Sequence, residues 1–205
     1  MDNRTQILQD LQQKAQLGAN PYSPLTSTED FFVQPQVPLA EAFKKTLEAI
    51  SGHCMIVPTI TDALNEIKQL CANEVPFCDN IEIIDLLCDK HIHYNNDPEW
   101  TRRAKISITT CEALSARTAS VAVSATQGIG RRAIAAPETH IVIAYANQLC
   151  ADLPEVFARL EKKYGSDYPS QITIITGPSR TADIEKTLVL GAHGPKKLMV
   201  FIVGD

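Results

Sequence analysis

The densest group of reactive side chains lies in the segment T-G-P-S-R-T-A-D-I-E, residues 176–185. A β-branched run precedes it, so the segment should follow a strand end, where open α/β sheets bind ligands. Arg180 can bind a carboxylate or phosphate through two parallel hydrogen bonds, and backbone N–H groups at a helix start attract anions. We therefore predict a site for a small anionic ligand. Its predicted residues are Thr176, Gly177, Ser179, Arg180, Thr181, Asp183 and Glu185.

A purely structural explanation accounts for much of the same segment. Gly177 permits a tight turn, and Ser179 or Thr181 can cap a helix running to about Leu190. Acidic residues in its first turn would be stabilised by the helix dipole. Such a helix start does not explain an arginine among hydrogen-bond acceptors, so the sequence favours a ligand site.

Three further polar positions are weaker candidates. We expect strands 172–176 and 198–203 to be parallel and joined by a helix, which would carry His193 and Gly194 to the opposite sheet edge. They would approach the site only if that helix is short or irregular. His140 begins a predicted strand, so it should lie away from that strand's carboxyl end.

The sequence assigns no catalytic nucleophile. It contains no G-x-S-x-G elbow, and no cysteine has an evident base beside it. The loop Q-G-I-G-R-R at 127–132 lacks the third glycine and the lysine of phosphate-binding motifs. Whether the chain is an enzyme therefore stays open.

The cysteine and histidine patterns indicate no metal or other cofactor bound by the chain. None of the six cysteines has C-x-x-C spacing, so we expect free, buried thiols. His91 and His93 are two residues apart with Asp97 near, but local ligands for a metal are too few. A polar turn is the simpler interpretation.

The composition favours one sizeable core: the 205 residues are 44% hydrophobic. The net charge of −5 and the absence of basic clusters argue against a nucleic-acid partner. No apolar run approaches the roughly 20 residues of a membrane span, and the N-terminus lacks the apolar core of a secretory signal. We expect a cytoplasmic protein.

Strands and helices alternate through most of the chain, which predicts an α/β fold with a largely parallel sheet flanked by helices. One antiparallel pair is expected within residues 105–125. The predicted helices are 39–51, 59–71 and 153–164, with a helical turn at 111–117. The predicted strands are 53–57, 105–110, 118–125, 140–145, 172–176 and 198–203, with a weaker one at 81–87.

The first 38 residues form a separate region before an α/β domain at 39–205. Residues 3–17 have the apolar stripe of an amphipathic helix. Residues 19–38 contain four prolines, which predicts an extended arm. The arm would either pack on a second subunit, giving a homodimer, or fold back on its own core.

The motifs T-G-P-S-R-T-A-D-I-E and L-G-A-H-G-P-K-K-L closely resemble the lactate-utilization protein C family, whose members carry a LUD domain. The stretches A-L-S-A-R-T-A-S and P-E-T-H-I-V-I-A extend the likeness more loosely. The resemblance implies a NagB/RpiA/CoA-transferase-like fold. It also implies a cytoplasmic role in oxidising lactate to pyruvate with two partner proteins, at least one carrying iron–sulfur clusters. The chain would be a non-redox subunit or accessory protein.

The resemblance also brings Arg117 and Thr118 into the predicted site. Many relatives read A-x-T-G-[ST], where this chain has Ala119 in place of the glycine. If that glycine lets the backbone approach a ligand, the ligand or activity of this chain would differ. Two alternatives remain: a stand-alone transferase or isomerase acting on an acyl-CoA or sugar phosphate, and a scaffold with a vestigial site.

Overall fold

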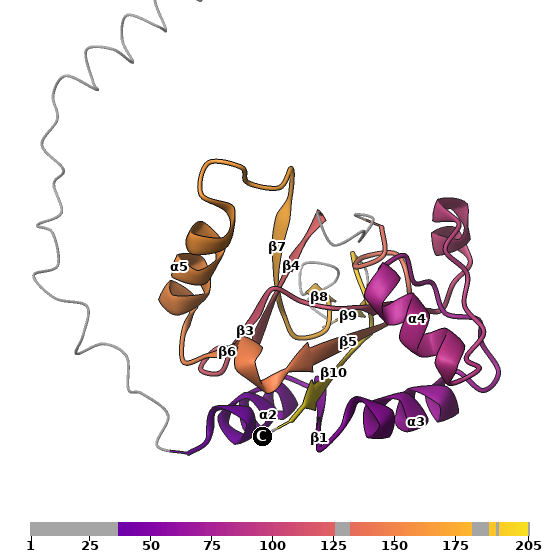
Figure 1. Ribbon diagram of the computed structural model, residues 1–205, viewed down its shortest axis with the longest axis horizontal. Helices are drawn as coiled ribbons and strands as arrows, with labels where there is room; N and C mark the ends of the chain where they lie inside the picture. Colours follow the sequence, from indigo (N-terminus) through magenta and orange to yellow (C-terminus); the bar gives the residue numbers. More distant parts are fainter. Residues whose placement is uncertain (1–36, 126–131, 182–188, 192, 205) are drawn as a thin grey trace, which may run out of the picture. The chain divides into compact units, whose positions relative to one another are not determined.

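The computed structural model describes residues 37–125, 132–181, 189–191 and 193–204 (Figure 1). The predicted helix at 3–17 and all but the last two residues of the predicted arm lie outside these ranges. The domain boundary at residue 38 therefore stays a prediction.

The first sheet contains β1 (His53–Val57), β10 (Lys197–Val203), β5 (Thr139–Tyr145) and β2 (Ile106–Thr109), in that order. All three pairings are parallel. The predominantly apolar strands are buried on both faces, as expected for a parallel sheet covered on both sides. This sheet confirms the predicted α/β class.

Helices cover both faces of the first sheet. α3 (Ile60–Leu70) and α4 (Ile81–Asp89) pack on one face, and α2 (Leu39–Ala49) packs on the other. α3 begins with a capping box in which Thr59 and Asp62 exchange hydrogen bonds. The predicted helices at 39–51 and 59–71 are thus confirmed.

The second sheet has the order β6 (Leu149–Cys150), β3 (Ala113–Ser115), β4 (Ser120–Ser124) and β7 (Ile172–Thr176). β4 runs antiparallel to both β3 and β7, whereas β6 is parallel to β3. Apolar side chains of β3 and β4 share a core with the first sheet.

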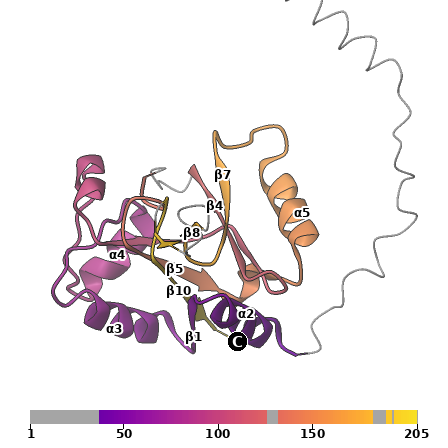
Figure 2. The same ribbon diagram turned by 180° about the vertical axis from the view of Figure 1, so that it is seen from behind.

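α5 (Leu153–Tyr164) covers the other face of the second sheet. Figures 1 and 2 both show α5 next to β7, with α3 and α4 on the opposite side of the strands. Asp152 caps α5, and Pro154 lies in its first turn, so the predicted helix at 153–164 is confirmed. Two short 3-10 helices, η2 (Pro98–Arg102) and η4 (Ala146–Gln148), precede β2 and β6, respectively.

The predicted strand–helix–strand unit at the end of the chain is wrong. β7 is antiparallel in the second sheet, and β10 is parallel in the first. At the two described ends of the predicted helix, β8 (Arg180–Thr181) instead pairs antiparallel with β9 (Val189–Leu190). Residues 182–188, the middle of the predicted helix, lie outside the described residues.

Two shorter predictions were also wrong. The weak strand at 81–87 is α4, because Asn80 caps a helix by accepting from the backbone N–H of Ile83, and Ile83 and Leu87 are buried one turn apart. The helical turn at 111–117 is β3, and the expected antiparallel pair within 105–125 consists of β3 with β4.

Candidate functional site

A row of hydroxyl groups crosses one end of the second sheet. Ser120 pairs in register with Ser115 on one side and Thr176 on the other. The Oγ1 of Thr118 lies 2.8 Å from Ser115 Oγ and 2.7 Å from Ser120 Oγ, and Ser120 Oγ lies 2.7 Å from Thr176 Oγ1. Two predicted site residues, Thr118 and Thr176, are therefore joined through Ser120, which the sequence analysis missed.

The hydroxyl row has a direction. Thr118 donates its single proton to Ser115, so Ser120 must donate to Thr118, and Thr176 must donate to Ser120. Ser115 is buried and Thr176 is exposed. The exposed end of the row therefore offers lone pairs and accepts a hydrogen bond.

The turn after Thr176 is packed against the end of α2. Gly177 is buried with φ of 76°, and a Cβ there would lie 2.9 Å from Ile50 Cδ1. The guanidinium of Arg180 donates to the carbonyl oxygen of Ile50, and Arg180 has no acidic partner among the described residues. Because Ile50 precedes β1, Arg180 lies at the amino-terminal edge of the first sheet, not at the predicted carboxyl edge.

The two polar segments that were predicted to lie apart are adjacent. The amide of Ser179 donates to the carbonyl of Pro195, and the amide of Gly191 donates to the carbonyl of Ser179, each at 2.9 Å. His193 and Gly194 therefore lie in a segment tied to Ser179, with His193 exposed. Thr181 is in β8. Asp183 and Glu185 lie outside the described residues.

Arg117 takes part in a link to α5. Its Nε donates to Asp152 Oδ2 at 2.7 Å. Burial raises the pKa of Asp152, but hydrogen bonds from Arg117 and the Leu153 amide outweigh it, so the pKa is lowered overall. The neighbouring Ala119 is buried with φ of 51°, a conformation that favours glycine.

His140 is fully buried in β5, and its Nε2 lies 2.8 Å from Thr109 Oγ1. Burial lowers the pKa of His140 to about 4. The ring is therefore neutral near pH 7, so it cannot hold an anion by charge.

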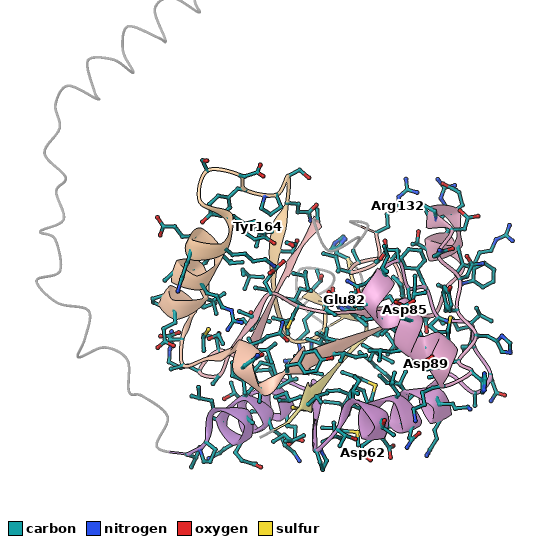
Figure 3. All side chains as sticks on the ribbon, in the orientation of Figure 1. Asp62, Glu82, Asp85, Asp89, Arg132 and Tyr164 are labelled. Atoms are coloured by element: carbon teal, nitrogen blue, oxygen red, sulfur yellow. The ribbon has the colours of Figure 1, made fainter. Side chains whose placement is uncertain are left out.

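A buried carboxylate network was missed by the sequence analysis. Glu112 Oε1 accepts from Ser124 Oγ at 2.5 Å and from Tyr164 OH at 2.6 Å, and Oε2 lies 2.6 Å from Lys163 Nζ. Tyr164, labelled in Figure 3, is the last residue of α5. The available signal was a lone glutamate between the apolar residues Cys111 and Ala113. The network fastens the end of α5 to the second sheet.

All six cysteines are free and five are buried, but Cys88 is exposed, contrary to expectation. Two surface hollows of about 500 and 370 Å³ share His91, Ile92 and His93 in their walls. Within the described ranges, no group of three or more His, Cys, Asp or Glu side chains could hold a metal ion. No helix there is long and apolar enough to cross a membrane.

Residues 77–203 match the family model described as the LUD domain. The chain is 35% identical over 109 residues to "Lactate utilization protein C" of Bacillus velezensis, covering 52% of this chain and 45% of that protein. It is 27% identical over 169 residues to the protein of the same name in Macrococcus caseolyticus, covering 75% and 73%. For most such relatives, the match spans about half of their length.

A crystal structure of a DUF162 family protein from Deinococcus radiodurans has a similar fold. The TM-score is 0.62 at 17% sequence identity, with 83% of this chain and all of that chain covered. At this identity the likeness concerns the fold alone.

Proposed function

The chain belongs to the LUD-domain family, and we propose on this premise that it is a non-redox subunit or accessory protein of a cytoplasmic iron–sulfur complex that oxidises lactate to pyruvate. The relatives named "Lactate utilization protein C" support the metabolic role. A NagB/RpiA/CoA-transferase-like classification is part of the same proposal, supported by the parallel sheet between helices.

The ligand of this protein is a small anion bound where β7 ends. The arrangement of Thr176 and Arg180 supports this proposal. Thr176, at the exposed end of the hydroxyl row, provides a hydrogen-bond acceptor, and Arg180 provides a cation four residues further along the chain. A hydroxy acid suits both groups. Its hydroxyl would donate to Thr176 Oγ1, and its carboxylate would meet the guanidinium of Arg180, the stronger type of charge-assisted bond.

A thermal-shift experiment on the full chain tests the ligand. L-lactate, D-lactate, pyruvate, phosphate and coenzyme A would each be titrated against wild type, Arg180→Ala and Arg102→Ala. Arg102 is the matched control, because it is an exposed arginine paired with Glu99. We expect a lactate-induced rise in Tm that Arg180→Ala abolishes and Arg102→Ala retains. An equal response of both variants would contradict the assigned site.

Growth and co-purification test the cellular role separately. Deletion of the gene should abolish growth on lactate, and the tagged chain should co-purify with iron–sulfur proteins from lactate-grown cells. Growth on lactate that does not depend on the gene would refute the proposal. Turnover of an acyl-CoA or sugar phosphate by the purified chain would instead establish a transferase or isomerase. Co-purification without any ligand response would indicate a scaffold.

A further inference from the structure

Two buried polar atoms on neighbouring strands of the first sheet have no hydrogen-bond partner among the described residues. They are Ser107 Oγ in β2 and His140 Nδ1 in β5, and both residues are fully buried. Ser107 and His140 are paired in the parallel register, so their side chains leave the same face of the sheet. That face packs against α2 and the second sheet.

Leaving both atoms without a partner would destabilise the fold, because a buried polar group that loses its bonds to water needs a replacement. The two side chains do not bond to each other. Neighbouring strands lie about 4.8 Å apart, so the two side chains start close enough for one small molecule to bond to both, at about 2.8 Å from each. A water molecule can both donate and accept, so one water can bond to the hydroxyl and to the ring nitrogen together.

We propose that one uncharged hydrogen-bonding molecule, a water, is bound between Ser107 Oγ and His140 Nδ1 inside the first sheet. Thr109 contacts the opposite ring nitrogen, Nε2, and so holds the imidazole in the orientation that presents Nδ1. The molecule is neutral because none of these three residues offers a charge to offset that of a buried ion. This site is independent of the proposed lactate role.

Water-to-protein cross-relaxation in the full-length, isotope-labelled chain tests the proposal. We expect a long-lived water signal at the His140 ring protons, lost in Ser107→Ala. The same variant should lower Tm by about 2–4 °C, since the water loses an anchor. If the Ser107 hydroxyl has no partner at all, the change in Tm has the opposite sign. Ser107→Ala then raises Tm, because it removes a buried polar group that had lost its bonds to water.

Ser120→Ala is the matched control. Ser120 is also buried, but its partners are Thr118 and Thr176, so this variant should keep the water signal at His140. The proposal is overturned by a higher Tm in Ser107→Ala, by an unchanged water signal in that variant, or by cross-relaxation at His140 from a protein group instead of water. If Ser107→Ala fails to fold, the wild-type spectrum is the test: a long-lived water signal at the His140 ring protons supports the proposal, and its absence contradicts it.

Discussion

Lys163 Nζ lies 2.6 Å from Glu112 Oε2, which joins the last turn of α5 to the residue that leads into β3. The Glu112 side chain is 3% exposed and that of Lys163 is 51% exposed, so only the carboxylate is removed from water. Tyr164 and Ser124 complete its hydrogen bonding. A buried carboxylate with three donors stabilises the fold only while all of them remain.

Glu112→Gln should lower the free energy of unfolding by about 1–3 kcal/mol, because Lys163 loses its charge partner and one acceptor position becomes a donor. Urea denaturation at pH 7 measures this change. The control is Lys196→Ala at the exposed Lys196–Glu138 pair, which should change stability by less than about 1 kcal/mol. Equal effects of the two substitutions would show that the burial of Glu112 is irrelevant.

The same network should make stability sensitive to acid. Burial raises the pKa of Glu112, but hydrogen bonds from Lys163, Ser124 and Tyr164 outweigh it and lower the pKa overall. The stabilisation is therefore present above the ordinary glutamate pKa of about 4.5 and is lost as the pH falls through the lower folded value. Stability measured across this range should fall more steeply in wild type than in Glu112→Gln.

His140 should make stability depend on pH in a higher window. Its folded pKa of about 4 lies below the ordinary value of 6.5, so between these values the unfolded chain binds a proton that the folded chain does not. Stability should therefore fall by about 3 kcal/mol as the pH drops from 6.5 to 4. An NMR titration of His140 with a midpoint near 6.5 would contradict this prediction.

Ala119→Gly should leave stability within about 1 kcal/mol of wild type. Alanine at this positive φ costs about 1–2 kcal/mol, which glycine relieves. Two losses offset this gain. Glycine gives the unfolded chain more conformational entropy, which costs about 0.4–1 kcal/mol, and the buried methyl group that is removed had contributed about 0.8 kcal/mol. The control Ala122→Gly in β4 removes a buried methyl without relieving strain and should cost about 1.5 kcal/mol. Chemical denaturation distinguishes the two.

Gly177→Ala should destabilise the protein by about 2 kcal/mol or more. The substitution adds the left-handed backbone penalty and a Cβ 2.9 Å from Ile50 Cδ1. Gly204 also has positive φ, but a Cβ there meets Ala146 at an ordinary 3.9 Å, so Gly204→Ala isolates the backbone penalty. If the two variants unfold at the same urea concentration, crowding against α2 contributes nothing.

The sequence predicted the elements whose signals are local. Thr59 and Asp152 mark two helix starts, and the apolar runs at 53–57 and 140–145 mark strands of the first sheet. α4 was missed because its dense isoleucines resemble a strand until Asn80 is recognised as a cap. The division into two sheets depends on contacts between distant residues, which no local pattern encodes.

The candidate site was predictable in residue type but not in arrangement. Thr118 and Thr176 were both predicted, yet Ser120, which connects them, has no special signal in the sequence. Arg180 was expected at a carboxyl edge because β7 was assigned to the parallel sheet. Its contact with Ile50 follows from the antiparallel pairing of β7 with β4 in the second sheet, which depends on contacts between residues far apart in the sequence.

The single exposed thiol provides a built-in reporter of folding. In the native protein, a bulky maleimide should modify Cys88 alone, and denaturation should make all six cysteines reactive. Mass spectrometry would then measure the unfolded fraction as the share of molecules that carry six adducts instead of one. A fluorophore attached at Cys88 would lie beside the hollow lined by His91 and His93, where it would sense any molecule that docks there.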